Sequence, residues 1–400
     1  MELVSRFYDV YTLVLLAVWS GVLFVWVLDG KHSRWEGVIF KALALMLIIF
    51  SATRYETGYD WPAYKEFYLL GDQLEGRYDF ELGFRVLAGL LREVNAGFSV
   101  FQFLVSALQV FFTTLFIRKF FKGLSIFALA IYYTIPDLYL INSFSLMRQG
   151  LALSLFLCGA IYYIERKSFR SFVLFAGALM FHMSSAFAVF AFFAVRMLMP
   201  GYVLFAFCAW GLCLLYLAGV SVPGVLIGVM VKLPYLDKYA IYGSLDTPSA
   251  SIAYKVLFVA LFQSLFLLAC YRRRLLVRAG NYGVEEAFGF GLACLAVIIS
   301  FFFWAYPTFL SRFQAFFVFF LIGWVLQAFD FSRCGNRFIL FCAVFGLVGA
   351  LYVKFVLTTI SIVYFPYQSV FSENIEFLST GSERTDKLYD ELRWLWRGVE

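Results

Sequence analysis

About eleven long apolar stretches, separated by shorter polar ones, dominate this chain. Most are about 20 residues long, the length that an α-helix needs to cross the hydrocarbon core of a bilayer. Their apolar positions are continuous rather than alternating, so the pattern predicts spanning helices and not the strands of a membrane barrel. The stretches lie approximately at residues 10–28, 37–52, 98–117, 124–140, 144–164, 171–195, 201–219, 252–271, 286–305, 309–329 and 338–360.

The composition agrees with this pattern. Hydrophobic residues make up 63% of the 400 residues and charged residues 14%, against about 45–50% and 25% in soluble proteins. A soluble fold could not cover so much apolar surface with its polar side chains. The net charge of +6 is modest and scattered, which excludes a nucleic-acid-binding domain. We therefore predict an all-α polytopic membrane protein with a single transmembrane domain over residues 1–400.

Basic residues in short loops predict which helix ends face the cytoplasm. Basic clusters follow the runs that end near residues 117, 164, 271 and 329. Simple alternation misplaces the cluster after residue 271, unless the run 171–195 is interrupted. The sequence Phe181-His182-Met183-Ser184-Ser185 lies in the middle of that run, so we expect a helix break at His182 that faces a cavity. Alternatively, a weak run such as 124–140 does not cross the membrane.

Simple alternation makes the polar stretch 53–97 an extracytoplasmic loop, and the break makes 220–250 a second one. Aromatic and leucine residues recur at helical spacing twice within 53–97, which predicts two short amphipathic helices against the membrane face. Residues 382–400 form a third amphipathic pattern, with leucines on one side and basic residues placed to reach head groups. We expect this C-terminal helix to be an anchor.

Two carboxylates and one arginine of the loop 53–97 are candidates for chemistry. Asp60 precedes Trp61-Pro62 and is placed for a helix N-cap, while Arg54 could snorkel toward the head groups. Glu81 begins the second short helix, where a carboxylate suits the helix dipole. Each of these structural roles competes with a role in an active site.

Three further ionisable residues lie in or near apolar runs, where a charged side chain is costly and therefore indicates a function. Arg148 follows several turn-forming residues at the start of a helix, an arrangement that suits an anion such as phosphate. His182 is either a hydrogen-bonded core residue or a functional one. Arg312 follows Pro307 at the start of a run, where it could bind an anion or snorkel.

Motifs for nucleotide binding are missing from the sequence: it has no P-loop, no Rossmann glycine pattern and no kinase set. Any transfer reaction would therefore use a donor that is already activated in the membrane.

Several short motifs occur in a characteristic order between residues 50 and 370. They are Arg54-Tyr55-x-x-Gly58-x-Asp60 with Tyr64 and Phe67, Phe80-Glu81-x-Gly83-Phe84, Met147-Arg148-Gln149, Phe181-His182-x-Ser184, Ser311-Arg312-Phe313 and Tyr364-x-Pro366-Tyr367. This ordered set resembles the EpsG family of polysaccharide-assembly membrane proteins, which are related to Wzy-type polymerases. One departure is Leu82, where the family often has proline.

The resemblance implies a GT-C-like fold and a multi-pass protein of the bacterial inner (plasma) membrane. It implies a polymerase that joins oligosaccharide repeats carried on undecaprenyl diphosphate into O-antigen, capsule or exopolysaccharide at the outer face of that membrane. The expected partners are the lipid-linked glycan, the bilayer, a chain-length regulator and a flippase, with no nucleic acid and no cofactor.

The resemblance also suggests a role for each candidate residue. The base that activates the acceptor hydroxyl would be Asp60, with His182 as the alternative. Arginines can neutralise the leaving diphosphate, so no metal is expected, although Asp60 and Glu81 could hold one. The residues expected to bind the diphosphate are Arg54, Arg148, Gln149 and Arg312, and those expected to bind sugar are Tyr64, Glu81 and Tyr367.

Two other functions fit part of this pattern. A flippase for lipid-linked sugars would need polar residues along a path through the membrane, whereas the candidates here cluster near the outer side. A polytopic acyltransferase that modifies a surface glycan would use His182 as its base and would not need Asp60.

Overall fold

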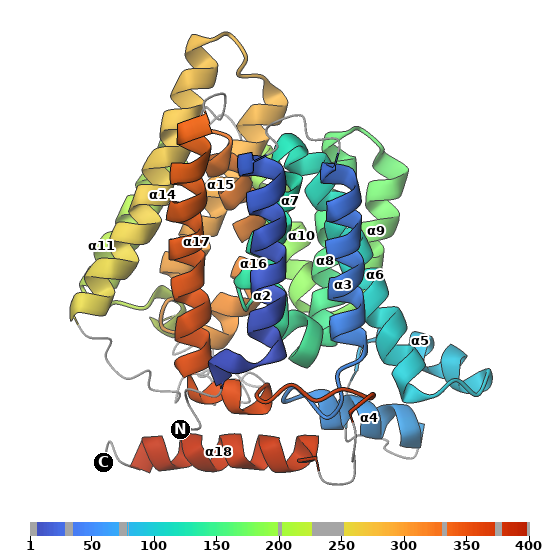
Figure 1. Ribbon diagram of the computed structural model, residues 1–400. Coiled ribbons are helices and arrows are strands. Elements are labelled where there is room, and N and C mark those ends of the chain that lie inside the picture. Colours follow the sequence, from blue (N-terminus) through green and yellow to red (C-terminus); the bar gives the residue numbers. More distant parts are fainter. Residues whose placement is uncertain are drawn as a thin grey trace. The chain divides into compact units, whose positions relative to one another are not determined.

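The structure, a computed structural model, describes residues 6–28, 35–71, 78, 80–198, 202–225, 252–329, 334–372 and 378–397 (Figure 1). Apart from one isolated bridge between Arg54 and Ser369, the regular elements of these residues are helical. Six of the helices are long and apolar enough to cross a membrane, and several shorter ones are also apolar. The predicted all-α polytopic membrane fold is therefore confirmed.

The chain forms two compact units, which we call the first unit (residues 1–185 and 331–400) and the second unit (residues 186–330). The single domain expected over residues 1–400 stays a prediction. The helices of the first unit are α2 (Val10–Val22), α3 (Glu36–Ala52), α4 (Trp61–Leu70), α5 (Leu82–Glu93), α6 (Phe98–Phe120), α7 (Ser125–Thr134), α8 (Met147–Ile164), α9 (Ser168–Phe181), α17 (Cys334–Leu357) and α18 (Gly381–Arg397).

Helix α8 is the centre of the first unit. It packs against α6 on one side and α9 on the other, and α3 packs in turn against α6 (Figure 1). Most of the α8 side chains are buried, whereas α6 buries Phe101 and Val105 but exposes Val100 and Phe103. A helix with one exposed apolar face in a membrane protein presents that face to lipid, because lipid needs no polar cover.

The second unit contains α11 (Tyr202–Leu217), α14 (Ile252–Arg278), α15 (Val284–Phe302) and α16 (Pro307–Leu326), and most of α10 (Ser184–Leu198) belongs to it. Helix α15 contacts α11, α14 and α16. The apolar run predicted to end at residue 271 continues as a helix to Arg278. The helix extends because arginine can stay helical and cover apolar surface: Arg272 lies over the Trp324 ring, 3.9 Å from the ring centre.

The run 124–140 does not form one spanning helix. Its α-helix, α7, is only ten residues long and ends at Thr134. Ile135 is extended (ψ 109°) because the following Pro136 disfavours helical backbone in the residue before it. The alternative, that this run does not cross the membrane, stays a prediction.

The helix break predicted at His182 is confirmed. Helix α9 ends at Phe181, His182 is extended (φ −161°, ψ 132°), and α10 begins at Ser184. The two helices are 14 and 15 residues long, each shorter than a full crossing. The cavity that His182 was expected to face stays a prediction.

The two short helices predicted within 53–97 are present as α4 and α5, at the end of the first unit where α18 also lies (Figure 1). The second predicted loop, 220–250, falls mainly on residues 226–251, which are outside the described residues. The sides of the membrane assigned to both loops stay predictions.

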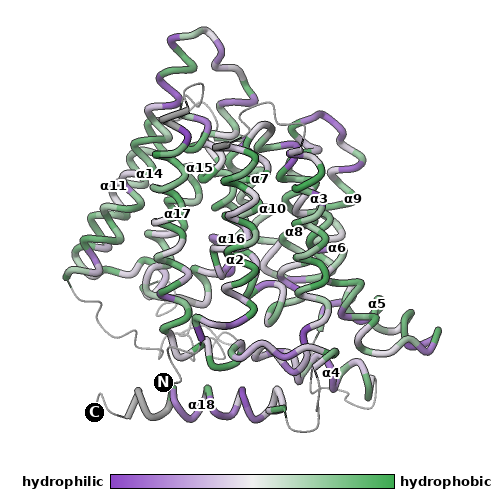
Figure 2. The backbone as a smooth tube through the Cα atoms, viewed as in Figure 1, coloured by the Kyte–Doolittle hydropathy of each residue, from purple (hydrophilic) through white to green (hydrophobic). Residues whose placement is uncertain are grey.

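The C-terminal helix α18 lies across the ends of α2 and α17 (Figure 1). It is largely hydrophilic, in contrast to those two helices (Figure 2). Its first turn is held by the Gly381 N–H, which donates to Glu56 at 2.8 Å, and by Arg384, which donates to the Pro366 carbonyl at 2.9 Å. Leu388 is buried on the inner side of the helix. The side chains from residue 393 onward, including the basic residues predicted to reach head groups, are outside the described residues.

Candidate functional site

Helices α4 and α5 carry the candidate carboxylates and are fixed to the bundle by an aromatic cluster. The cluster joins buried side chains of α4 and α5 to α6 and to the first residue of α8. Its members are Tyr64, Phe67, Tyr68, Phe80, Phe84, Ala88, Phe101, Val105 and Met147. Large aromatic side chains bury much apolar area with few rotatable bonds, so this packing holds the N-terminus of α5 next to that of α8.

A second contact places the start of α5 against the end of α9. Gly83 lies so close to α9 that a Cβ atom at this position would be 2.9 Å from the Met180 carbonyl oxygen and 3.1 Å from its carbon. Only glycine allows this approach of two backbones. Because Met180 is two residues before His182, the contact brings Glu81 to the helix break.

Glu81 joins Arg148 and His182. Its Oε2 atom accepts a hydrogen bond from the Arg148 guanidinium, and its Oε1 atom lies 2.8 Å from Nδ1 of His182. The Met183 N–H also donates to Oε1, at 3.2 Å. Glu81 occupies the N-cap position of α5, but its side chain makes no capping hydrogen bond to that helix. The predicted helix-dipole role therefore does not describe its contacts, which go to α8 and to the break after α9.

All three side chains of this cluster are largely buried: 14% of Glu81, 17% of Arg148 and 13% of His182 is exposed. Burial alone raises the pKa of Glu81, but the His182 hydrogen bond and the Arg148 charge outweigh it and lower the pKa to about 2. Glu81 is therefore ionised at neutral pH and holds an arginine and a histidine together.

This lowered pKa predicts how stability depends on pH. Since the folded-state pKa of Glu81 is below the ordinary value of 4.5, its stabilisation is complete above pH 4.5 and is lost as the pH falls toward 2. We expect wild type to exceed Glu81→Gln in free energy of unfolding by about 2 kcal/mol at pH 6 and to lose that advantage in acid. Thermal unfolding of both proteins in detergent from pH 7 to 3 measures this difference in stability. A difference in Tm that does not shrink below pH 4.5 would contradict the assignment.

Arg148 lies in the first turn of α8, as the sequence predicted, and aromatic rings surround it. Its guanidinium carbon is 4.3 Å from the centre of the Phe80 ring and 5.9 Å from that of Tyr64. The Tyr64 hydroxyl in turn donates to Asp60 at 3.4 Å. The structure thus connects Asp60 to Arg148 through Tyr64.

Asp60 occupies the N-cap position of α4, with Pro62 in the first turn, as the sequence predicted. Its carboxylate nevertheless makes no cap hydrogen bond, because the backbone of Asp60 is in the helical region (φ −92°, ψ −4°). An N-cap residue normally has extended backbone, which turns its side chain back over the first turn. The carboxylate of Asp60 is instead directed to Tyr64.

Arg54 is fully buried, at 0% exposed, and is not part of the Glu81 cluster. Its guanidinium donates to the Ser51 carbonyl and lies 5.0 Å from the centre of the Phe144 ring. Burial lowers the pKa of Arg54 to about 10, so it stays protonated at neutral pH. The Gln102 side chain holds the Arg54 carbonyl at 2.8 Å. Its contacts join the end of α3 to neighbouring segments, and its predicted role in binding diphosphate stays a prediction.

The other predicted site residues are placed as follows. Gln149 is 2% exposed, next to Arg148. The Tyr367 hydroxyl donates to the Phe50 carbonyl at 2.9 Å and lies 3.0 Å from the Thr53 hydroxyl, so it is engaged at the end of α3. Arg312 belongs to α16 of the second unit. The roles predicted for these residues in binding diphosphate or sugar stay predictions.

Sequence reasoning missed two features of the site. Phe80, whose ring lies against the Arg148 guanidinium, is part of a motif, but nothing in the sequence assigns it to the site. Glu81 is predicted to bind sugar, whereas in the structure it binds the guanidinium of Arg148. Its place in a motif with Gly83 was the available signal, since glycine marks a close approach of backbones.

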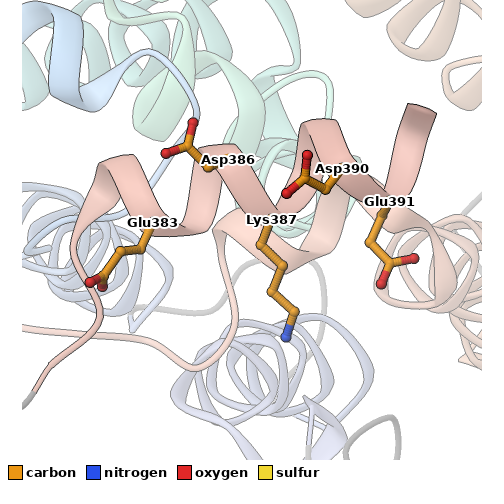
Figure 3. A pocket seen from close by; sticks show the side chains of 5 residues that line it. All are labelled: Glu383, Asp386, Lys387, Asp390 and Glu391. Carbon is orange, nitrogen blue, oxygen red and sulfur yellow. The ribbon is translucent and has the colours of Figure 1, made fainter. Parts of the chain in front are cut away.

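Within the part of the chain that the structure describes, no group of three or more His, Cys, Asp and Glu side chains could hold a metal ion. An open hollow runs along α18, lined by four carboxylates and one lysine (Figure 3): Glu383, Asp386, Lys387, Asp390 and Glu391. None of these five residues belongs to the Glu81 cluster.

Comparison with known proteins gives one result. The model of the EpsG family matches residues 37–369, which is most of the chain. Neither the curated proteins nor the solved structures include a match to the sequence or the fold. The matched range includes Glu81, Arg148 and His182 as well as Asp60 and Tyr64.

Proposed function

The chain belongs to the EpsG family, and on this premise we propose that it is a membrane glycosyltransferase that polymerises lipid-linked oligosaccharide repeats into a surface polysaccharide. Family membership supports a glycan-polymerising membrane enzyme in general. The undecaprenyl-diphosphate donor, the product class (O-antigen, capsule or exopolysaccharide) and the outer face of the inner membrane as the place of reaction are parts of our proposal.

The observation that carries the proposal is the cluster of Arg148, Glu81 and His182 at the ends of α8 and α9. Transfer from a lipid diphosphate needs a cation for the leaving group and a base for the acceptor hydroxyl. Arg148 supplies the cation: it is in the first turn of a helix, where backbone N–H groups also favour an anion. His182 belongs to this cluster and Asp60 is connected to it through Tyr64, so either residue could act as the base.

The proposed reaction transfers the growing glycan. An acceptor hydroxyl of the incoming repeat attacks C1 of the donor sugar, and a new C1–O bond forms. The bond between C1 and the diphosphate oxygen breaks, its electron pair stays on the diphosphate, and Arg148 stabilises that charge. The hydroxyl proton passes to the base. The products are a longer lipid-linked glycan and free undecaprenyl diphosphate.

A reconstituted reaction tests this proposal. Purified protein in nanodiscs is incubated with lipid-linked repeats and with no nucleotide sugar or other protein, and the glycans are separated by size. We expect a ladder of products. Unchanged repeats with folded protein would contradict the proposal. Transport of a fluorescent lipid-linked sugar across the vesicle membrane, without any ladder, would favour the flippase. Modification of the glycan that requires an acyl donor would favour the acyltransferase.

The Asp60→Asn variant tests the contribution of the second carboxylate. Asp60 is connected to the cluster by a hydrogen bond from Tyr64, so we expect polymerisation to slow about tenfold, the effect of about 1.4 kcal/mol from one charge-assisted hydrogen bond. Initial rates of ladder formation measure it. Asp386→Asn, which removes an exposed carboxylate from α18, is the matched control and should have no effect. A loss of 100-fold or more would identify Asp60 as the base.

The proposed partners follow from the reaction. A flippase has to deliver the lipid-linked repeat to the outer face, and a chain-length regulator would determine when transfer stops. The lipid tails of donor and acceptor stay in the bilayer throughout, so the protein needs to bind only the diphosphates and the sugars.

A further inference from the structure

Glu81 divides its two carboxylate oxygens between the two groups that the reaction needs. Oε2 is bound by Arg148, and Oε1 lies 2.8 Å from Nδ1 of His182. The same Oε1 accepts the Met183 N–H. An ionised carboxylate can only accept hydrogen bonds, and Glu81 is ionised at neutral pH. The ring nitrogen that faces it must therefore carry a proton.

This requirement selects one form of the imidazole. When the neutral His182 ring has its proton on Nδ1, its other nitrogen, Nε2, carries a lone pair and can accept a proton. We propose that Glu81 is a positioning residue that holds neutral His182 in the Nδ1–H form, so that Nε2 is the base that takes the proton of the acceptor hydroxyl. This inference rests on the proposed function and assigns the base to His182 rather than to Asp60.

The backbone around His182 is fixed from both sides, as an orienting contact requires. The His182 N–H donates to the Ala178 carbonyl at 3.1 Å, which continues the hydrogen bonding of α9. The His182 carbonyl accepts the Ser185 hydroxyl at 2.7 Å and the Ser185 N–H at 3.1 Å, at the start of α10. The ring can therefore turn only about its own side-chain bonds, and the hydrogen bond to Glu81 sets that rotation.

The contact also balances charge during transfer. When Nε2 takes the hydroxyl proton, His182 becomes positively charged, and the carboxylate of Glu81 at 2.8 Å stabilises it. The electron pair of the broken C1–O bond stays on the diphosphate beside Arg148. The imidazolium then returns its proton to solvent, which restores the neutral ring. One carboxylate thus keeps the base and the cation at a fixed distance from each other.

Nitrogen NMR can observe the protonated ring nitrogen directly, because the chain has only two histidines, His32 and His182. The His32→Gln protein, labelled with ¹⁵N-histidine in nanodiscs, leaves one imidazole. Spectra are recorded at increasing pH until the nitrogen shifts no longer change, which identifies the signals of the neutral ring. We expect a protonated Nδ1 and an unprotonated Nε2. In Glu81→Ala we expect a shift toward the Nε2–H form that free histidine prefers.

Kinetics give the second measurement, on the ladder reaction with lipid-linked repeats. We expect Glu81→Gln and His182→Gln each to lower kcat on the order of 100-fold, the contribution of a general base, with a smaller change in KM for Glu81→Gln. Glu93→Gln, at the exposed C-terminal end of α5, is the matched control and should behave as wild type.

The outcomes separate the inference from the proposed function. A wild-type His182 with its proton on Nε2, or a ring unaffected by replacement of Glu81, would overturn the inference even if polymerisation is observed. The expected NMR result without any ladder would support the positioning of His182 and contradict the polymerase. If Glu81→Ala is not monodisperse, Glu81→Gln, which keeps the shape of the side chain, is used for the same NMR measurement.

Discussion

Replacing Arg148 with alanine is expected to lower polymerisation by 100-fold to 1,000-fold, on the order of the loss of one preorganised donor to a developing negative charge. The guanidinium is held by Glu81 and covered by the Phe80 ring at 4.3 Å, so it is oriented before the donor binds. Its removal leaves the diphosphate without its proposed counter-charge. In cells, the surface would then carry single repeat units in place of long chains.

Two variants separate the arginine's chemistry from its structural effect. Arg148→Lys keeps the charge but loses the planar fork that can bind two oxygens, so we expect an intermediate rate. Arg85→Ala removes an exposed arginine from α5, one turn after Glu81, and should leave the rate unchanged. Ladder formation is compared at equal amounts of monodisperse protein. Long chains in Arg148→Ala would remove this residue from the mechanism.

Replacing Gly58 with alanine is expected to destabilise the protein by about 3 kcal/mol. Gly58 has φ +105°, a conformation that alanine rarely adopts. A Cβ atom there would lie 2.8 Å from the carbonyl carbon of Phe144, in the segment that leads to α8. The Gly58 N–H also donates to the Val363 carbonyl at 3.1 Å. Alanine would therefore force apart the segments that hold Asp60 near the start of α8.

The apparent Tm in detergent and the yield of monodisperse protein measure this effect. Gly89→Ala is the matched control: Gly89 lies within α5, with no atom near the position of a Cβ, and alanine there should stabilise the helix by up to about 1 kcal/mol. Gly58→Ala protein with an unchanged Tm would show that the backbone at this position can relax.

The sequence predicted the helical segments of this protein but not all of their lengths. Continuous apolar runs require helices, because lipid offers no hydrogen-bond partner to the backbone. Within such runs hydropathy carries no information about where a helix ends. Pro136 stops α7 after ten residues although the apolar run continues, and α14 runs on through its arginines to Arg278. The break at His182 was predictable because the basic clusters did not fit simple alternation and polar residues lie inside the apolar run.

Candidate residues were also recognisable, since ionisable groups are rare in this chain and each one is conspicuous. Their grouping was not. Glu81 lies 67 residues from Arg148 and 101 residues from His182 along the chain, and no spacing rule relates positions so far apart. The arginine in the same loop, Arg54, was an equally reasonable partner until the structure placed it in a fully buried position among other segments.

By itself, the sequence determined that this is a helical membrane protein of the EpsG family with a few charged residues available for chemistry, because composition, hydropathy and short motifs are local properties of the chain. Only the tertiary structure decided that Glu81 holds Arg148 and His182 while Asp60 contacts Tyr64. That choice depends on the aromatic packing of α4 and α5 against α6 and on the close approach of Gly83 to α9. Both are contacts between distant segments, which no local pattern specifies.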